Sequence, residues 1–509
     1  MKKYLLYALF AVGLLSSCNM DEAPYGALDD DNAIQSANDA QRYRNGFYSG
    51  FRSMTSGSYI TKPELQADMF NGITINGNRN GTIANGNLLA GDGDVLSLWS
   101  TCYSRIASVN YFLSKAEPLL ENTEDADDRL DIERYIGEAH FTRAFYYIAL
   151  FDRFCQVYSA DKGDTPALGV PITLEYNPTA DRSKYPGRST MNESVKLIND
   201  ELNLALTAMQ TYEASDKKHV APMSPYICSY TVMAMQARFA LMIGDYATAI
   251  SKAESVINSK VYTLANTDNY IDMWVNDESS EIIFRPFASS SEQPNLNATG
   301  TAWISIYDDR ADYIPGFEAL AMYEDGDVRF DAFFNIRGLT VDGDEYPCYN
   351  FNKFPGNPAL KTSTANNIMN MPKPFRLSEQ YLILAEAAAM NNQPDKANAA
   401  LNTLRANRII DWEDANYSGQ VLIQQVRDER TKELIGEGFR ITDLRRWKQG
   451  FKRSYDYPAA WGLDPILVTA GLSVQYSADD HRYTWPIPSD EIQVNPQLKG
   501  QQNPGYESM

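Results

Sequence analysis

Two stretches of the chain share one plan, in which an apolar helical segment is followed by a short turn and an alanine-rich segment. Residues 226–242 lead into "GDYATAISKAESVI", and residues 377–390 lead into "NQPDKANAALNTLRANR". The alanines that recur at helical spacing in the second segments are Ala247, Ala253, Ala397 and Ala400. Because small side chains let two helices approach closely, each stretch is predicted to form an antiparallel helix pair. Such a pair buries its apolar face against a neighbouring pair, so the sequence favours a stacked helical array.

Helical periodicity extends over much of the remaining chain. Apolar residues recur at three- and four-residue spacing in residues 32–54, 95–120, 131–154, 419–437 and 440–449. We pair the two segments on either side of Glu124, and we pair residues 419–437 with residues 440–449. The pattern predicts a mostly α-helical fold with a scaffold of about four tetratricopeptide-like helix pairs. A generic α-helical bundle is the alternative.

Two long regions lack this periodicity. Residues 261–374 are rich in Gly, Pro, Asn and Ser, contain β-like runs such as "EIIFRPF", and are broken by turn clusters such as "EDGD" and "VDGDEYP". Residues 455–480 form the second region. A connection of about 100 residues is far longer than usual in a compact domain, which indicates a functional surface. We therefore predict a single domain over residues 32–509, with a loop-rich insert that carries short strands at about 261–374.

The N-terminus has the order of an export signal. Lys2 and Lys3 precede an apolar run that ends at "LLSSCNMDEAPYG", and this run is shorter than the ~20 residues needed to span a bilayer. Leu15 to Cys18 resembles the lipobox of bacterial lipoproteins. This predicts a signal peptide over residues 1–17, lipidation of Cys18, and a tether over residues 18–31; an ordinary signal peptide with an incidental cysteine is the alternative. Residues 19–22 also resemble the acidic signal that directs some lipoproteins to the outer face of the outer membrane.

The net charge and the cysteines argue against several classes of binding partner. The net charge of −21 repels nucleic acid and anionic lipid, so attachment to a membrane is expected through the lipid anchor only. The cysteines apart from Cys18 are Cys102, Cys155, Cys228 and Cys348. Their wide spacing and the absence of CxxC argue against a zinc site, and buried free thiols are expected, with one or two disulfides as the alternative.

Three sequence motifs carry a family resemblance. They are "EAHFTRAFYYIALFDRF" at residues 138–154, "RDERTKELIGEGFRITDLRRWKQG" at residues 427–450, and "YTWPIPSDEIQVNPQLKGQQNPGY" at residues 483–506. Together they resemble the SusD/RagB family of outer-membrane lipoproteins, whose C-terminal motif would occupy about residues 427–506. The resemblance implies a surface lid on a SusC-type, TonB-dependent outer-membrane transporter. It further implies capture of glycans or, in the RagB branch, of peptides, without catalysis and without a cofactor.

The charged residues of the 427–450 motif are predicted to be structural. Glu429 and Lys432 stand three residues apart, the spacing of an ion pair on a helix surface. Arg430, Arg440 and Arg445 are expected to pair with acidic residues of the same motif. The candidate acidic partners are Glu429, Glu433 and Glu437. The prolines of "WPIPSDEI" and "NPGY" predict a rigid, extended tail packed on the helices.

Candidate ligand-binding residues come from aromatic and amide-rich irregular sequence. Sugar recognition uses aromatic faces for the apolar side of a pyranose and planar polar groups for its hydroxyls. In "TAWISIYDDRADYIPGF" the candidates are Trp303, Tyr307, Asp309, Arg310 and Tyr313. In "MFNGITINGNRNG" they are Phe70, Asn71, Asn76, Asn78 and Arg79, and Trp461 is the candidate of the second irregular region. Trp274 lies in a patterned stretch and is predicted to be part of the core.

Signatures of common enzymes and metal sites are missing. The sequence contains three histidines and no HExxH, GxSxG or GxxxxGK[ST] motif. "GDGDV" and "DGDEY" offer clustered oxygens, but neither has the spacing of an EF-hand loop, so no metal ligand is assigned. The sequence therefore predicts a non-catalytic, cell-surface glycan-binding lipoprotein. A peptide-binding lid is the first alternative, followed by a protein-binding repeat adaptor and a glycoside hydrolase.

Overall fold

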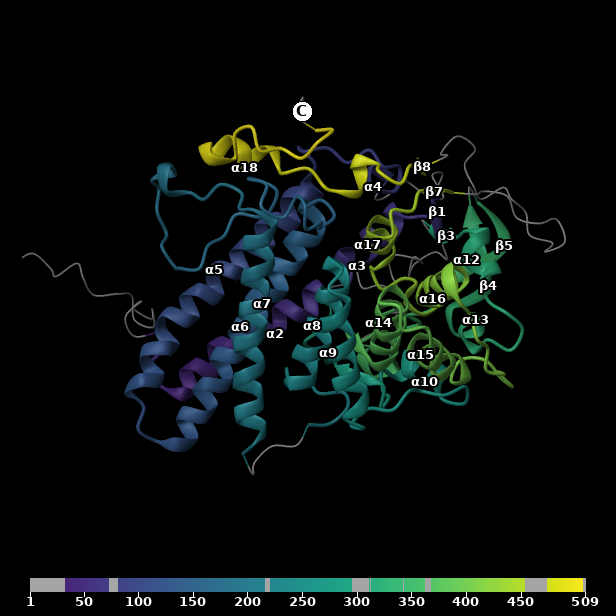
Figure 1. The fold of residues 1–509 in the computed structure, drawn as a ribbon, viewed down its shortest axis with the longest axis horizontal. Helices are drawn as coiled ribbons and strands as arrows, with labels where there is room; N and C mark the ends of the chain where they lie inside the picture. The colour runs from purple at the N-terminus through teal and green to yellow at the C-terminus, as the bar shows by residue number, and fades with distance from the viewer. Residues whose placement is uncertain are drawn as a thin grey trace, which may run out of the picture.

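The long helices lie side by side across most of the molecule (Figure 1). The computed structural model describes residues 33–72, 81–215, 220–294, 311, 313–341, 343–361, 368–453 and 474–506. Its longer helices are α2 (Ala37–Met54), α3 (Ser58–Gln66), α5 (Gly93–Asn122), α6 (Ala126–Phe154), α7 (Met191–Glu213), α8 (Ser229–Ile243), α9 (Tyr246–Asn258), α14 (Leu377–Met390), α15 (Pro394–Ala406) and α16 (Gly419–Leu434). The shorter helices are α4 (Gly81–Ala84), α10 (Tyr270–Asn276), α12 (Phe317–Ala321), α13 (Val328–Phe333), α17 (Arg440–Arg446) and α18 (Ser489–Val494).

Most of the predicted helix pairs are present. α5 packs on α6, α8 packs on α9, and α14 packs on both α9 and α15, which joins successive pairs into one array. The mostly helical fold is thereby confirmed. α16 packs on α14 and α15, and α17 lies against α3 instead of forming the predicted pair with α16. α7 has no counterpart among the predicted segments, and it packs between α6 and α8.

The α8–α9 turn shows why the alanine-rich pairs are tight. α8 ends at Ile243 and is capped by Gly244, whose φ of 78° is a left-handed conformation that glycine adopts without steric cost. The next residue, Asp245, caps α9 by accepting a hydrogen bond from the backbone N–H of Thr248 at 3.1 Å. Of the predicted alanines of α9, Ala253 is fully buried but Ala247 is exposed, and Ala249 is buried in its place. The short turn and the small buried side chains together hold the two helices close.

α7 is fixed by a capping box and by a close approach to α6. The Thr190 hydroxyl accepts from the backbone N–H of Glu193 at 3.1 Å, and the Glu193 carboxylate accepts from the N–H of Thr190 at 2.8 Å. Where the two helices cross, a Cβ on Gly137 would lie only 2.4 Å from the Cβ of Ala208. Glycine at this position of α6 therefore permits the contact with α7.

Short antiparallel strand pairs form in and around the predicted insert, and one of those described lies wholly within residues 261–374. β1 (Phe70–Gly72) pairs with β3 (Tyr313–Pro315), and β2 (Ile282–Phe284) pairs with β6 (Phe375–Arg376). The remaining pairs are β4 (Phe334–Val341) with β5 (Asp344–Phe351), and β7 (Phe451–Lys452) with β8 (Gln475–Tyr476). The β4–β5 hairpin is longer than the predicted short strands. Residues of β1, β2, β3, β4 and β5 join α10, α12 and α13 in a second apolar cluster, separate from the main helical core.

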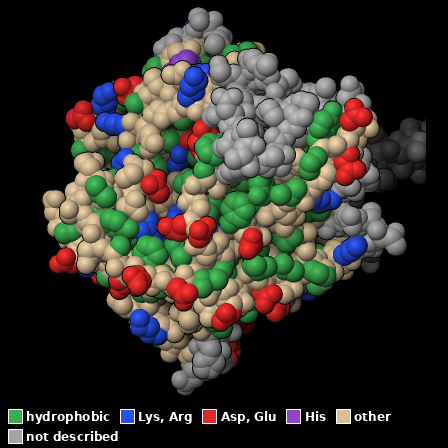
Figure 2. Space-filling model, turned by 90° about the vertical axis from the view of Figure 1, so that its right-hand side faces the viewer, with side chains coloured by type: hydrophobic (Ala, Val, Ile, Leu, Met, Phe, Trp, Pro, Cys, Tyr) green, Lys and Arg blue, Asp and Glu red, His purple; other side chains and the backbone are tan. Residues whose placement is uncertain are grey.

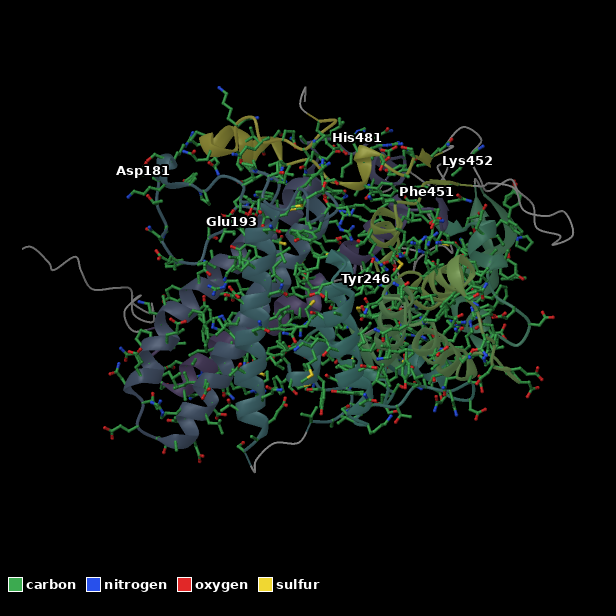
Figure 3. The ribbon with its side chains drawn as sticks, viewed as in Figure 1. Asp181, Glu193, Tyr246, Phe451, Lys452 and His481 are labelled. Atoms are coloured by element: carbon green, nitrogen blue, oxygen red, sulfur yellow. The ribbon has the colours of Figure 1, made fainter. Side chains whose placement is uncertain are left out.

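The C-terminal tail packs on the helices, with extended stretches on either side of the short helix α18 and a 3-10 turn at Pro496–Leu498. Trp485 is buried, meets the ring of Phe154 edge-on at 6.2 Å, and donates its indole N–H to Gln66 Oε1 at 3.0 Å. The Asn503 amide donates to the backbone carbonyls of Phe154 and Trp485 at 2.9 and 2.7 Å. His481 of the tail lies near β7 at the same end of the molecule as α18 (Figure 3). The prediction that the tail packs on the helices is confirmed, but its expected extended course is interrupted by α18.

The cysteines of the described residues are free thiols in the interior. They are Cys102, Cys155, Cys228 and Cys348. This confirms the expectation of buried free thiols, while Cys18 lies outside the described residues. Within the described ranges, no helix has both the length and the apolar character needed to cross a membrane.

Candidate functional site

The structure brings two of the predicted ligand-binding segments together, but in the interior. Phe70 and Asn71 lie in β1 and Tyr313 lies in β3, and these two strands pair with each other. The exposed fractions of the three residues are 0, 1 and 3 %. The Phe70 ring meets the ring of Phe351 edge-on at 5.0 Å. A side chain closed to solvent offers no face to a sugar, so in this structure these three residues are core residues rather than a ligand surface.

The other predicted ligand residues, and the predicted lipidation site, lie outside the described residues. They are Cys18, Asn76, Asn78, Arg79, Trp303, Tyr307, Asp309, Arg310 and Trp461. Trp274 is 1 % exposed, which confirms its assignment to the core. Cationic groups surround its ring, with Lys353 Nζ at 4.5 Å and Arg376 Cζ at 5.0 Å from the ring centroid.

One open hollow on the described part of the insert combines aromatic and acidic side chains. We call it the acidic hollow, and its volume is about 510 Å³. It is lined by Leu320, Ala321, Tyr323, Glu324, Asp325, Gly326, Asp327, Val328, Phe330, Asp331, Tyr349 and Ile410. It lies at α12, α13 and β5, on the right-hand side of Figure 1. Figure 2 shows this side of the molecule, where hydrophobic side chains gather between Asp and Glu carboxylates.

The aromatic rings of the acidic hollow are held in place by one another. Tyr323 and Tyr349 both meet Phe330 edge-on, at ring-centroid distances of 6.1 and 5.7 Å. The Tyr323 hydroxyl donates to the backbone carbonyl of Lys432 at 3.0 Å, which ties this ring to α16. All three rings are half-buried, so part of each faces the hollow. Rings fixed in this way keep their orientation for a stacking ligand.

Carboxylates supply the polar part of the acidic hollow. Asp325 and Asp331 are exposed and form no ion pair with any other described residue. Glu324 differs, since its carboxylate lies 3.0 Å from Lys432 Nζ. An ionised carboxylate accepts hydrogen bonds from hydroxyl groups at two oxygens. The hollow can therefore bind a neutral polyhydroxylated ligand, with rings for its apolar faces and carboxylates for its hydroxyls. Within the described ranges, no group of His, Cys, Asp or Glu side chains is arranged to hold a metal ion.

Beneath the acidic hollow, a buried ion network joins the insert to α16. Glu433 lies 2.8 Å from Arg376, 2.9 Å from Arg408 and 3.3 Å from Arg329, and all four side chains are buried. Burial by itself would raise the pKa of Glu433, but the three guanidinium groups hold that pKa well below its usual value. Glu433 is therefore a carboxylate at physiological pH and the central anion of the network.

A second acidic residue, Glu429, extends the network to the wall of the hollow. Its carboxylate lies 2.6 Å from Arg329, 2.7 Å from Arg405 and 3.3 Å from Lys432. Arg329 in turn binds Asp327 through two hydrogen bonds of 2.8 and 2.7 Å, and Asp327 lines the hollow. Bidentate pairs of this kind fix both groups in one geometry. The network therefore positions α13 and the floor of the acidic hollow relative to the scaffold.

The partners of the 427–450 motif differ from those predicted. Its arginines are largely buried and structural as expected, but Arg430 pairs with Asp443 at 2.8 Å, Arg440 with Asp68 at 2.7 Å, and Arg445 with Asp152. The acidic residues of the motif pair mainly with cations from distant parts of the chain. Glu429 and Lys432 do form the predicted pair, although inside the protein rather than on its surface. Sequence spacing alone gave no signal for the distant partners.

Two related family models match the N-terminal and C-terminal parts of the chain. Residues 337–506 match the model described as "SusD family". Residues 21–241 match a second SusD-like model, described as "Starch-binding associating with outer membrane". The two matches do not overlap and together span most of the chain.

Individual relatives agree with the family matches. The chain is 22 % identical over 457 residues to the SusD-like protein P25 of Formosa agariphila, with 79 % of this chain and 78 % of that protein covered. Its fold is similar to that of a SusD superfamily protein from Bacteroides thetaiotaomicron, with a TM-score of 0.75, 24 % identity, and coverage of 92 % of this chain and 100 % of the other. It is also similar to the surface glycan-binding protein A of Bacteroides fluxus, with a TM-score of 0.66, 19 % identity, and coverage of 93 and 100 %. From its helical scaffold, its packed C-terminal motif and these matches, the chain belongs to the SusD/RagB family.

Proposed function

We propose that this protein is a cell-surface lipoprotein that captures a glycan and delivers it to a SusC-type, TonB-dependent outer-membrane transporter. The observation that carries the proposal is the match of residues 21–241 to a family described as starch-binding and associated with the outer membrane. The structurally similar surface glycan-binding protein A of Bacteroides fluxus supports the same ligand class. Residues 1–17 act as the signal peptide, Cys18 carries the lipid, residues 18–31 form the tether, and residues 32–509 form one domain.

The acidic hollow is the part of the glycan site that the described residues contribute. Its rings of Tyr323, Phe330 and Tyr349 suit the apolar faces of sugar rings, and Asp325 and Asp331 suit their hydroxyls. The candidates Trp303 and Tyr307 belong to the same insert in the sequence, and we propose that they also contact the glycan. A volume of about 510 Å³ falls in the range of small-ligand sites.

The protein binds its ligand without converting it. Capture for a transporter requires only reversible binding, and the sequence contains none of the HExxH, GxSxG and GxxxxGK[ST] motifs. The glycan should therefore be recovered unchanged after incubation with the protein.

The proposal is tested by titration calorimetry of the soluble chain that begins at Asn19. The panel contains neutral α- and β-glucans, other plant and host polysaccharides, and mixed peptides. Saturable heat with one glycan class and no released product supports the proposal. Heat with peptides alone would indicate a peptide-binding lid, and release of shorter sugars would indicate a hydrolase.

Matched variants then locate the site. The double variant Asp325→Asn with Asp331→Asn, and the double variant Trp303→Ala with Tyr307→Ala, should each weaken glycan binding by about tenfold or more, because several hydroxyl or stacking contacts are lost. Asp479→Asn removes an equally exposed carboxylate from the C-terminal tail and should leave binding unchanged. Unchanged binding in both double variants would place the glycan elsewhere on the protein.

A further inference from the structure

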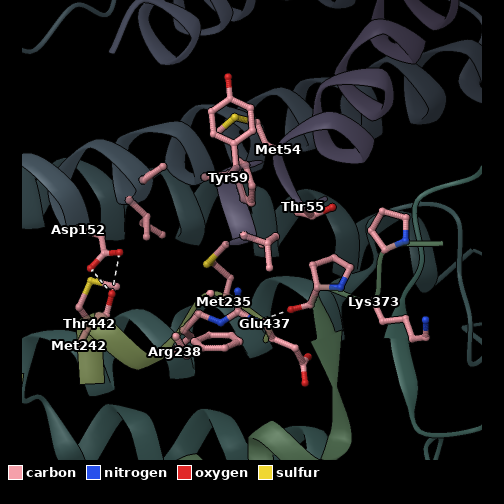
Figure 4. A pocket seen from close by; sticks show the side chains of 18 of the residues that line it. Met54, Thr55, Tyr59, Asp152, Met235, Arg238, Met242, Lys373, Glu437 and Thr442 are labelled. Atoms are coloured by element: carbon pink, nitrogen blue, oxygen red, sulfur yellow. Dashed lines mark hydrogen bonds between the residues drawn. The ribbon is translucent and has the colours of Figure 1, made fainter. Parts of the chain in front are cut away.

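A second concave site lies between the helical scaffold and the C-terminal part of the chain, away from the acidic hollow. It consists of two adjoining chambers with volumes of about 200 and about 130 Å³. Both chambers are lined by Met54, Tyr59, Phe145, Ala149, Asp152 and Arg153. Because further methionines line the larger chamber, we call the whole site the methionine groove. Figure 4 shows Met54 and Tyr59 on one side of the larger chamber and Met235 and Arg238 on the other.

The walls of the methionine groove are apolar and adaptable. The methionines of the larger chamber are Met54, Met235, Met242 and Met371, and they come from α2, from α8 and from the segment before β6. Methionine is unbranched and polarizable, so it fits irregular apolar ligands. An apolar protein cavity of about 150 Å³ holds benzene. The larger chamber therefore has room for a ring-sized group or a comparable length of alkyl chain, and the smaller chamber has room to continue it.

The rim of the methionine groove is open to solvent in part. Tyr59, Phe145, Ala149, Met242 and Phe439 line it, and each is only half-buried. When an apolar ligand covers these half-exposed apolar side chains, apolar surface is removed from water, which favours binding. The site is thus accessible without a rearrangement of the core.

One cation in the methionine groove keeps unused hydrogen-bonding capacity. Arg153 Nη2 lies 3.1 Å from Asp152 and 3.4 Å from the backbone carbonyl of Gly438. Its Nε and Nη1 form no hydrogen bond with any described residue. Asp152 is shared, because it also accepts from Arg445 at 2.9 Å and from the Thr442 hydroxyl at 3.0 Å. One carboxylate between two guanidinium groups leaves one positive charge uncompensated at the junction of the chambers.

The other charges around the methionine groove are balanced. Arg238 binds Glu379 through two contacts of 2.6 Å. Lys373 pairs with Asp277, Lys62 pairs with Asp94, and Arg446 is held between Glu386 and Asp443. Arg430 also pairs with Asp443, and Glu437 pairs with Lys353 and Arg376. The chain has a net charge of −21, so a local excess of positive charge inside an apolar groove stands apart from the rest of the protein and favours an anionic ligand there.

We propose that the methionine groove binds an apolar monocarboxylate. The alkyl or aryl part fills the two chambers, and the carboxylate accepts charge-assisted hydrogen bonds from Arg153 at their junction. Size, apolar walls and charge all point to this ligand class, while a neutral glycan would leave its hydroxyls against methionine and phenylalanine side chains. The site and its ligand are independent of the proposed glycan site on the insert.

Calorimetry of the soluble chain from Asn19, which contains every residue that the structure describes, tests this proposal. The probes are octanoate, 3-phenylpropanoate, octanol and octylammonium. Saturable binding of a carboxylate, at least about tenfold tighter than that of octanol or octylammonium, is expected because Arg153 interacts with the anionic group alone. Comparison of the two carboxylates distinguishes an alkyl from an aryl ligand. Equal binding of all four probes, or no binding of either carboxylate, would overturn the proposal.

Two groove variants and one control separate binding from folding. Arg153→Gln should weaken octanoate binding by about tenfold and remove the preference over octanol. Ala149→Phe keeps all charges but places a ring between the two chambers, and it should abolish binding of both probes. Arg42→Gln removes an exposed arginine from α2 and should have no effect.

The thermal midpoint of each variant is measured alongside binding. If Arg153→Gln unfolds because Asp152 loses a partner, the Ala149→Phe variant still tests whether the groove is the binding site. Full octanoate affinity in a folded Ala149→Phe variant would refute the groove as the site. Glycan binding should survive in the folded groove variants, which distinguishes failure of this inference from failure of the proposed glycan function.

Discussion

At the scale of single residues, Glu64 is the clearest case of a side chain whose ionisation is controlled by the fold. It lies in α3 with no exposed surface, and its Oε1 accepts from the backbone N–H of Gly438 at 2.7 Å. Burial raises the pKa of Glu64 to about 7, although hydrogen bonds from the Gly436–Arg440 turn oppose the shift. The folded state thus holds a proton that the unfolded chain releases at a lower pH.

The proton on Glu64 should make the free energy of unfolding depend on pH. Since the folded pKa lies above the unfolded one, the stabilisation is complete below the unfolded pKa of 4.5 and is lost as the pH rises through about 7. Between pH 5 and pH 8, Glu64→Gln should reduce the fall in the free energy of unfolding by about 2 kcal/mol, measured by urea denaturation. Identical slopes for variant and wild type would contradict the assignment.

At the scale of secondary-structure elements, the crossing of α6 and α7 depends on the missing side chain of Gly137. A Cβ there would overlap with Ala208, so Gly137→Ala should destabilise the protein by roughly 1–3 kcal/mol despite the higher helix propensity of alanine. Gly46, in the middle of α2, is the control, because it is exposed and a Cβ would meet nothing within 4 Å. Gly46→Ala should stabilise by up to about 1 kcal/mol. Thermal unfolding of both variants checks the contrast, and equal effects would exclude steric overlap as the cause.

At the scale of the whole molecule, the buried ion network joins the insert to the helical scaffold. Glu433→Gln leaves Arg376 and Arg408 buried without their shared carboxylate, so it should cost about 3–5 kcal/mol of stability. The partly exposed pair of Glu254 with Lys396 joins α9 and α15 near the surface, and Glu254→Gln should cost less than about 1 kcal/mol. Denaturant titration compares the two. A small effect of Glu433→Gln would mean that the network positions the insert without stabilising it.

Local sequence patterns predicted much of the fold. The segment 377–390 is helix α14 with the predicted bounds, and the α5–α6 and α8–α9 pairs form where apolar and alanine spacing placed them. Helix α7 was missed, although the Thr190 and Glu193 capping box at its start is a signal that sequence reading can find. Helical spacing and caps act within a few residues along the chain, which is why the sequence alone determined these elements.

The candidate sites depended on contacts between distant segments. Pairing of β1 with β3 buried Phe70 and Tyr313, while the acidic hollow brings together Phe330, Tyr349 and Ile410. Likewise, Glu433 meets cations that lie far from it in the chain. The sequence by itself determined the helices, the irregular insert and the family motifs. Only the tertiary structure decided which aromatic rings are buried and which charges meet, because burial and ion pairing depend on the spatial neighbours of a side chain.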